Sequence, residues 1–364
     1  MRGGTSKGVF LRPENLPADA AARDRLLLRI VGSPDPYGKQ IDGMGAATSS
    51  TSKVVLVSKS KRPDCDVDYL FGQVRIDAPV IDWSGNCGNL TTAVGPFAIS
   101  EGLVAAPSDG AALVRIWQVN IGKQILAHVP MRGGQVVEEG DFELDGVTFP
   151  AAEVKLEFLD PGAEGAMFPT GSVVELLGKI EATLINAGNP TIFIAASDLG
   201  LKGTEMQADV DGNTELLARA EAIRCQGSVA MGLAANLAEA AQRGHTPKLC
   251  FIAVPAGYTA SDGKPVAAGS IDLLARIFSM GKLHHAMTGT GGVAIAVAAA
   301  VPGTLVHKLA RKNADGRIRF GHPSGTLSVG AEARAEGGQW IVSKALMSRS
   351  ARRLMEGWVR IPNV

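Results

Sequence analysis

Two stretches of the chain contain no charged residue, and each directly follows a turn rich in glycine and polar side chains. The first runs over 90–99 after Ser84-Gly85-Asn86-Cys87-Gly88-Asn89, and the second over 293–301 after Ala286-Met287-Thr288-Gly289-Thr290-Gly291-Gly292. A helix that is apolar on every face is buried on every side. The pattern predicts a weak internal duplication: two domains, each with strands wrapped round one buried helix, the helix N-termini able to face one cleft.

The remaining pattern predicts a mixture of strands and outer helices. Apolar positions recur on a helical period over 20–31, with Asp19 as a candidate N-cap and Gly32 at the end, and over 209–242. A short helix is expected over 271–278, with Ser270 as its N-cap. Asp315-Gly316-Arg317 is typical of a hairpin turn. Strands are expected over 54–57, over 111–129 as a pair around 120–123, and over 173–184, 191–194, 249–254, 327–331 and 340–342.

Composition and charge exclude several functional classes. The 364 residues suggest two domains, and Lys+Arg and Asp+Glu both number 36, so no net field draws the protein to nucleic acid or an acidic membrane. No apolar run predicts a membrane span, and the residues after Met1 do not resemble a signal peptide. Cys65, Cys87, Cys225 and Cys250 lack disulfide or metal-ligand spacing and indicate reduced thiols, so no metal and a cytoplasmic location are expected.

Two residues stand out as candidates for chemistry. Cys87 lies on a Gly-rich turn that opens a buried helix, where free backbone N–H groups and the helix dipole favour negative charge. Most free cysteines are instead small buried hydrophobes. Lys53 precedes the apolar run 54–57, a place where a lysine is usually solvated. If its side chain points inward, desolvation lowers the pKa of its amine toward that of a working base.

The first residues of the chain form a polar, glycine-rich segment, Met1-Arg2-Gly3-Gly4-Thr5-Ser6-Lys7-Gly8. The Walker spacing is absent, so a nucleotide phosphate loop is not predicted. Two interpretations remain: a flexible start, or a loop whose amides and hydroxyls bind a carboxylate.

Seven motifs together resemble those of the 2-methylaconitate cis–trans isomerase (PrpF) family of propionate catabolism and the methylcitrate cycle, which also includes 4-oxalomesaconate tautomerases and aconitate-type isomerases. The similarity runs nearly end to end. The motifs are the segments 1–8, 32–45, 49–53, 67–74, 82–89, 186–191 and 288–292.

The resemblance implies a fold and a domain division. The α+β fold would be that of diaminopimelate epimerase: two pseudo-symmetric domains, each a barrel-like sheet around a central buried helix, with the active site between them. The first domain would comprise 1–107 plus about 346–364, and the second 108–345. The family usually has another strand before the first Gly-rich loop, so the first domain is expected to lack an edge strand, or Met1 is not the true start.

The resemblance also assigns roles to residues. Cys87 and Lys53 match the catalytic pair, and no cofactor is implied. The residues that match substrate-contacting loops are Arg2, Gly3, Gly4, Thr5, Ser6, Lys7, Ser49, Ser50, Thr51, Ser52, Asn86, Gly88, Asn89, Asn189, His285, Met287, Thr288, Gly289, Thr290 and Gly291. His284-His285 fits a structural role equally well. Diaminopimelate epimerase has a second cysteine where this chain has Thr288, which disfavours a two-thiol racemase.

The expected reaction is a cofactor-independent isomerisation of 2-methyl-trans-aconitate to 2-methyl-cis-aconitate. Lys53 would remove a methylene proton, and Cys87 would act as its acid–base partner or hold the intermediate. A 4-oxalomesaconate tautomerase or aconitate isomerase using the same site is the alternative, and a non-catalytic partner of an aconitase-type enzyme is a third. The expected ligand is a small unsaturated di- or tricarboxylate. A homodimer and functional pairing with an aconitase-type dehydratase are further expectations.

Overall fold

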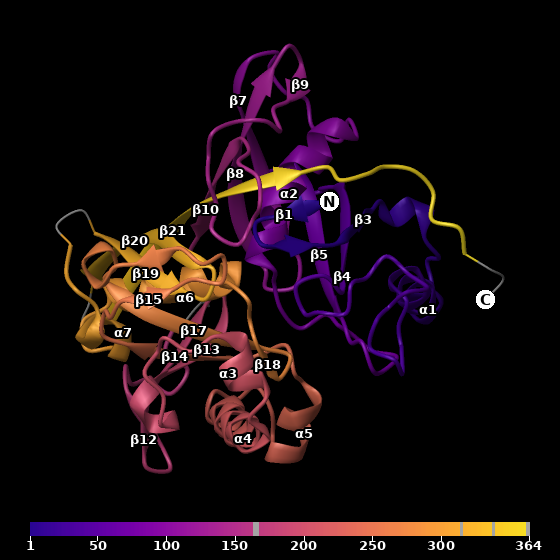
Figure 1. Cartoon of the computed structure of the whole chain (residues 1–364). Helices are drawn as coiled ribbons and strands as arrows, with labels where there is room; N and C mark the ends of the chain where they lie inside the picture. Colours follow the sequence, from indigo (N-terminus) through magenta and orange to yellow (C-terminus); the bar gives the residue numbers. More distant parts are fainter. Residues whose placement is uncertain (163–166, 314–315, 337–338, 362–364) are drawn as a thin grey trace. The chain divides into compact units, whose positions relative to one another are not determined.

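The computed structural model describes residues 1–162, 167–313, 316–336 and 339–361 (Figure 1). The chain forms two compact units. Unit 1 comprises Met1–Leu156 and Arg349–Val364, and unit 2 comprises Glu157–Ser348. The domain borders expected from the sequence, after 107 and after 345, stay a prediction.

Unit 1 is built on strands that alternate between parallel and antiparallel pairing. β3 (Val9–Leu11) is parallel to β4 (Lys53–Lys59), and β4 is antiparallel to β5 (Val67–Val74). β5 is parallel to β7 (Gly110–Gln118), which is antiparallel to β8 (Lys123–Arg132). The smaller strands of this unit are β1 (Arg2–Gly3), β2 (Ser6–Lys7), β6 (Ile81–Asp82) and β9 (Gln135–Val136).

One helix, α2 (Gly88–Ser100), occupies the interior of unit 1. Its residues from Gly88 to Ala98 are all buried, and it packs against β1, β2, β4, β7, β8 and β9. A β-carbon at Gly95 would lie 2.8 Å from Val129 Cγ2, so a larger residue there would push the helix off β8. Elsewhere in the unit, α1 (Ala20–Val31) buries one face against β4, and η1 (Pro13–Asn15) is a single 3₁₀ turn.

Unit 2 repeats this pairing order. β13 (Asn189–Ala195) is parallel to β14 (Lys248–Ala253), and β14 is antiparallel to β17 (Leu273–Ser279). β17 is parallel to β19 (Arg317–His322), which is antiparallel to β20 (Gly325–Glu336). In each unit the third strand pairs with a short strand before the buried helix begins, β6 before α2 and β18 (Lys282–Leu283) before α6 (Gly289–Ala300).

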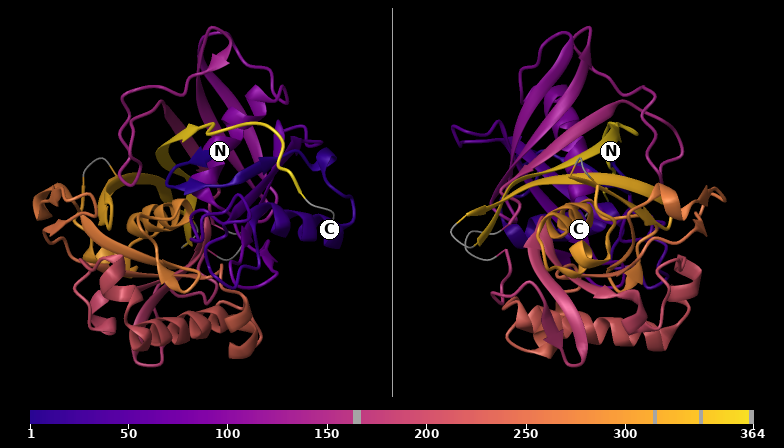
Figure 2. Two further views of the ribbon diagram at one scale, coloured as in Figure 1. Left: turned by 45° about the vertical axis from the view of Figure 1, so that its right-hand side comes forward. Right: turned by 90° about the vertical axis from the view of Figure 1, so that its left-hand side faces the viewer.

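The buried helix of unit 2 is α6, whose residues from Gly289 to Ala298 are all buried. Strands of its own unit surround the orange coil of this helix in the right-hand view of Figure 2. A helical layer covers the opposite face of β13 and β14 with apolar side chains, among them Val210, Leu216 and Ile223. This layer consists of α3 (Gln207–Asp211), α4 (Thr214–Ala230) and α5 (Leu237–Gln242).

The other elements include two strands that cross the border between the units, and several short strands and helices. β10 (Glu153–Leu159) and β21 (Gln339–Arg352) each contribute residues to both units. The remaining elements are β11 (Glu175–Leu177), β12 (Ile180–Ala187), η2 (Ala196–Leu199), β15 (Tyr258–Thr259), β16 (Pro265–Val266), η3 (Ala268–Ser270) and α7 (Leu305–Leu309). No helix in the described part of the chain is both long and apolar enough to cross a bilayer.

Most predicted elements are confirmed, and one is wrong. The helix over 20–31 forms as expected: the Asp19 side chain accepts a hydrogen bond from Ala22 N, and Gly32 ends it with φ 86°. The predicted helix over 271–278 is instead β17, whose residues are all buried. A short apolar run that is buried on both sides has no period to separate strand from helix. The predicted helical region 209–242 is divided into α3, α4 and α5. The predicted turn at Asp315 lies outside the described residues.

Candidate active site

Cys87 is held at the N-terminus of α2 by contacts on both its thiol and its carbonyl. Its Sγ accepts a hydrogen bond from Leu90 N at 3.5 Å, which makes Cys87 the N-cap. Its carbonyl oxygen accepts hydrogen bonds from Thr91 Oγ1 at 2.9 Å and from Tyr69 Oη at 3.2 Å. The side chain is only 8% exposed. The thiol is therefore fixed where backbone N–H groups favour negative charge.

Lys53 points into the interior of unit 1, where its charge interacts with that of Cys87. It is the first residue of β4 and is 6% exposed. Its Nζ donates a hydrogen bond to Gln73 Oε1 at 2.5 Å and lies 5.1 Å from the centre of the Phe71 ring. Burial lowers the pKa of Lys53, and the nearby Cys87 opposes that change. The amine of Lys53 consequently loses its proton at a lower pH than the amine of a solvated lysine does.

A second buried cation, Arg349 of β21, interacts electrostatically with Cys87. It is 1% exposed, and its Nε and Nη2 have no hydrogen-bond partner among the described residues. Burial lowers the pKa of Arg349 to about 10, while the charge of Cys87 acts in the opposite direction. Arg349 therefore stays positive at neutral pH.

Tyr69 completes the surroundings of Cys87. Burial, followed by the charge of Cys87, raises the pKa of Tyr69 well above its ordinary value. The hydroxyl therefore stays protonated and keeps donating to the Cys87 carbonyl. Neither Tyr69 nor Arg349 was predicted as a site residue, because nothing in the local sequence shows which side chains of a strand face the helix.

The Gly-rich loop packs directly on the first turn of α2. A β-carbon at Gly3 would lie 2.6 Å from Asn89 O, and one at Gly4, where φ is 50°, would lie 2.4 Å from Asn89 Oδ1. Asn89 Nδ2 also donates to Thr5 Oγ1 at 3.0 Å. Only glycine permits this close approach and the positive φ at Gly4. The loop therefore packs beside the helix N-terminus that Cys87 caps.

The other predicted residues of unit 1 connect this loop to β4. The guanidinium of Arg2 donates to Ser350 O at 2.7 Å, and burial lowers its pKa. The backbone N–H of Lys7 donates to Ser50 O at 2.9 Å. All of the predicted unit 1 residues lie on the segments around the N-termini of α2 and β4: Arg2 to Lys7, Ser49 to Ser52, Lys53, Asn86 to Asn89.

The predicted residues of unit 2 gather around the N-terminus of α6. Thr288 is the N-cap, and its Oγ1 accepts a hydrogen bond from Gly291 N at 3.0 Å. The turn before Asn189 packs against this helix, since a β-carbon at Gly188 would lie 3.3 Å from Thr290 O. Met287 is buried, and its Sδ would lie 3.1 Å from a β-carbon at Gly291. Gly289 and Thr290 are buried in the first turn.

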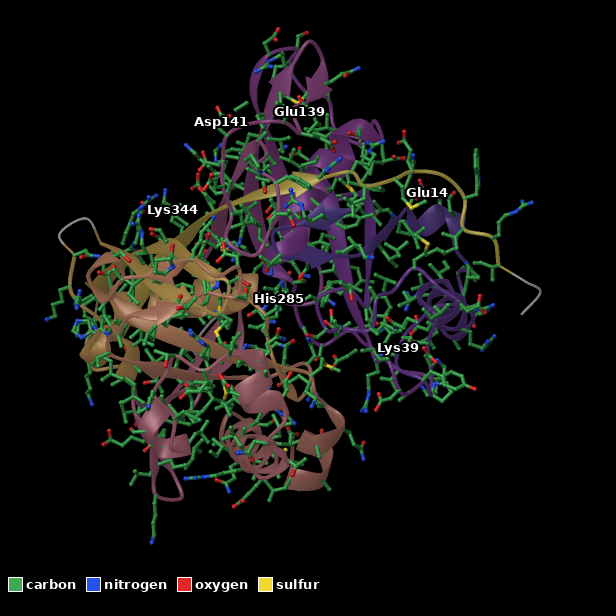
Figure 3. All side chains as sticks on the ribbon, in the orientation of Figure 1. Glu14, Lys39, Glu139, Asp141, His285 and Lys344 are labelled. Carbon is green, nitrogen blue, oxygen red and sulfur yellow. The ribbon has the colours of Figure 1, made fainter. Side chains whose placement is uncertain are left out.

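His285 lies between β18 and α6 and is labelled in Figure 3. Its ring stacks on that of His284 with centroids 4.7 Å apart, and its carbonyl oxygen accepts a hydrogen bond from Ser324 Oγ at 2.6 Å. Burial lowers the pKa of His285, so the ring is mainly neutral at pH 7. As for metals, the described residues include no group of three or more His, Cys, Asp or Glu side chains placed to hold an ion.

Comparison with known proteins identifies the family. A family model described as "PrpF protein" matches residues 1–362. The chain is 62% identical to a 2-methyl-aconitate isomerase of Cupriavidus necator and 60% identical to one of Shewanella oneidensis. Each alignment covers 100% of this chain and 96% of the relative.

A solved structure agrees with this assignment. The crystal structure of a methylitaconate-delta-isomerase superposes with a TM-score of 0.79 at 39% identity, covering 99% of this chain and 94% of that one. The fold belongs to the diaminopimelate epimerase-like class, as expected from the sequence. The chain is a member of the PrpF family, and the protein is an isomerase.

Proposed function

We propose that this isomerase converts 2-methyl-trans-aconitate to 2-methyl-cis-aconitate, as in propionate catabolism by the methylcitrate cycle, and that Lys53 and Cys87 transfer the protons. The identity of 62% to a protein named for this substrate supports the choice among unsaturated carboxylates. The observation that carries the mechanism is the buried amine of Lys53, which interacts with a thiol fixed at a helix N-terminus.

The proposed reaction begins with the neutral amine of Lys53. It takes a proton from the methylene carbon next to the alkene–carboxylate, and the C–H electron pair spreads into a dienolate. The bond order between the alkene carbons falls, so rotation about that bond interconverts the cis and trans forms. The Cys87 thiol then returns a proton to the carbon, and the Lys53 ammonium restores the thiol. Protons and electrons balance without a co-reactant.

Charge stabilisation is assigned to the surroundings of Cys87. The dienolate carries one more negative charge than the substrate, so it benefits from groups that favour negative charge at fixed positions. The backbone N–H groups at the start of α2 and the guanidinium of Arg349 are such groups. In this proposal the Gly-rich loop over Arg2–Lys7 and the hydroxyls of 49–52 bind the substrate carboxylates.

The test follows isomerisation and exchange together. Purified protein is incubated separately with 2-methyl-trans-aconitate, trans-aconitate and 4-oxalomesaconate in D2O, and NMR records the isomer ratio and the deuterium uptake. The fastest turnover is expected with 2-methyl-trans-aconitate, with deuterium entering the methylene position. Fastest turnover of 4-oxalomesaconate would instead identify a tautomerase, and no turnover of any of the three would favour a non-catalytic role.

Lys53→Ala tests the assigned base. We expect kcat to fall by at least about 100-fold, because a positioned general base contributes about that much or more. Lys59→Ala is the matched control, because Lys59 ends the same strand with an exposed side chain. Circular dichroism checks that both variants fold. Near-normal turnover by a folded Lys53→Ala protein would refute the assignment.

A further inference from the structure

Gln73 contacts Lys53 directly and lies inside the protein. The two residues are opposite each other in the antiparallel pairing of β4 and β5, and Gln73 is 0% exposed. Gln73 Oε1 accepts the hydrogen bond from Lys53 Nζ at 2.5 Å. Its Nε2 donates to the Ser52 carbonyl oxygen at 2.9 Å. Both ends of the amide are therefore engaged.

The orientation of this amide is fixed by chemistry. A carbonyl oxygen can only accept, so the NH2 group of Gln73 must face Ser52 and its oxygen must face Lys53. Ser52 is itself held, because its Oγ accepts a hydrogen bond from Gln40 Nε2 at 2.8 Å. Gln40 also donates to Ser33 Oγ at 2.8 Å and accepts from Ala47 N at 2.8 Å. A buried network thus holds the acceptor that Lys53 uses.

The group that accepts the hydrogen bond from Lys53 is a neutral amide, and this affects the protonation of the Lys53 amine. An ammonium beside a carboxylate is favoured in its charged form, whereas an amide oxygen adds no net charge. Within the described ranges, Lys53 forms no ion pair with Asp or Glu. Gln73 and Phe71 from β5 contact the Lys53 amine, and Cys87, the N-cap of α2, interacts with its charge. Tyr69 and Arg349 interact in turn with Cys87.

We propose that Gln73 is a positioning residue of the reaction: its amide oxygen fixes the direction of the Lys53 amine without supplying the negative charge that would keep the amine protonated. One N–H of the neutral amine is directed at Gln73, so the lone pair points away from β5. This inference rests on the proposed role of Lys53 as the base.

Unit 2 has a related arrangement at the equivalent strand positions. The pairing of Cys250 with Ile277 places Lys248 opposite Ser279, as Lys53 lies opposite Gln73. Lys248 Nζ donates to Ser279 Oγ at 3.3 Å and lies 3.3 Å from His245 Nδ1. A neutral acceptor thus faces the lysine in both units. The buried helix that follows is capped by Cys87 in unit 1 and by Thr288 in unit 2, so the two units differ in the group at the cap.

The decisive variant is Gln73→Glu, which keeps the shape and adds a negative charge. An opposite charge at hydrogen-bond distance raises the pKa of a lysine by about one unit or more. Because the base must be deprotonated, kcat/KM rises with pH through the pKa of Lys53. In Gln73→Glu, this rising limb of the pH profile of kcat/KM should move to higher pH by at least about one unit. Gln118→Glu is the matched control: Gln118 is also buried in a strand of unit 1, and its side chain contacts Asn120 and Ile121 instead of Lys53.

A direct measurement separates this inference from the proposed function. The NMR chemical shift of the Lys53 13Cε is followed as a function of pH in the wild type and in Gln73→Glu. The signal is assigned by its absence in Lys53→Arg, and the signal of Lys248 is the internal reference. Upward movement of both the NMR titration and the kinetic limb supports the inference. An unmoved NMR titration overturns it. A moved NMR titration with an unmoved kinetic limb shows that Lys53 is not the base, which refutes the proposed function and the reaction role of Gln73 with it.

Gln73→Met covers the case in which the charged variant fails to fold. Methionine has a similar length and no strong acceptor, so the amine loses its fixed direction. We expect kcat to fall at least about tenfold, with KM changed less than about twofold. An unchanged kcat in a folded Gln73→Met protein overturns the inference.

Discussion

At the scale of single residues, the burial of Lys53 affects the stability of the fold as well as the proposed reaction. Burial lowers the pKa of its amine in the folded protein below the ordinary value of 10.5. Between the lowered pKa and 10.5, the unfolded chain binds more protons than the folded one. The contribution of Lys53 to stability must therefore increase as pH rises through this window. Below the lowered pKa both states are protonated, and the full cost of burying the charge is present.

Lys53→Met removes this pH dependence. The free energy of unfolding of the wild type is expected to increase relative to that of Lys53→Met between pH 7 and pH 10, by at most about 1.4 kcal/mol per pH unit. In Lys53→Met the Gln73 oxygen loses its donor, which lowers the free energy of unfolding of the variant by the same amount at every pH. The change of the difference with pH is therefore unaffected. Urea unfolding at several pH values measures the difference, with Lys59→Met as the exposed control. A difference that stays constant or declines would show that the buried amine is not the group that titrates.

The residues of the candidate site differ in how far the sequence revealed them. Cys87 and Lys53 lie next to apolar runs whose burial is visible in the pattern, so their positions could be predicted. Gln73 lies within one of the resembling motifs, yet its role depends on the register that pairs it with Lys53. Arg349 lies within the long strand β21 at the other end of the chain, and only tertiary packing buries it where it interacts with Cys87. Long-range pairing of this kind has no local signal.

At the scale of elements, the thiol of Cys87 caps α2, and the proposed reaction gives it a second, separable role as proton carrier. Cys87→Ser keeps a cap, and serine is a strong N-cap residue, so folding stability should be retained or increased. Turnover should still fall by at least about 100-fold, because a serine hydroxyl is a far weaker acid than a thiol. Cys87→Ala should lose the same activity and also about 1 kcal/mol of stability.

Urea unfolding and the isomer assay, run on both variants, distinguish the two roles. Thr288→Ser is the control, because it preserves the hydroxyl cap on the equivalent helix α6. Turnover by Cys87→Ser close to that of the wild type would mean that the cysteine only caps the helix.

An element could be predicted where its apolar positions followed a helical period. It could also be predicted where a whole run was apolar, because a helix buried on every side shows no period. Helix α1 has a cap, an apolar face and a terminal glycine, so its bounds follow from local rules. Helices α2 and α6 were recognisable from uniform apolarity after a polar turn. β17 was assigned wrongly because its apolar run is short and buried on both faces, and pairing with β14 and β19 overrides any helical tendency.

At the scale of the whole chain, the internal duplication is clearer in the strand pairing than in the sequence. The order parallel, antiparallel, parallel, antiparallel recurs in β3-β4-β5-β7-β8 and in β13-β14-β17-β19-β20. The sequence showed only the two polar turns and apolar helices, because the repeated pairing is made by backbone groups that many side chains permit. The two units differ at the helix caps: Cys87 caps α2 in unit 1, and Thr288 caps α6 in unit 2.

The charge balance of the whole chain predicts how the reaction responds to salt. Lys+Arg and Asp+Glu are equal at 36, so no long-range field attracts an anionic substrate. The cations assigned to the reacting centre, Lys53 and Arg349, are buried and therefore weakly screened, and Arg2 and Lys7 of the binding loop are partly buried. We expect kcat/KM to change less than about twofold between about 20 and about 200 mM sodium chloride at fixed pH. Initial rates with 2-methyl-trans-aconitate measure this, and a tenfold decrease would instead show that surface charges steer the substrate.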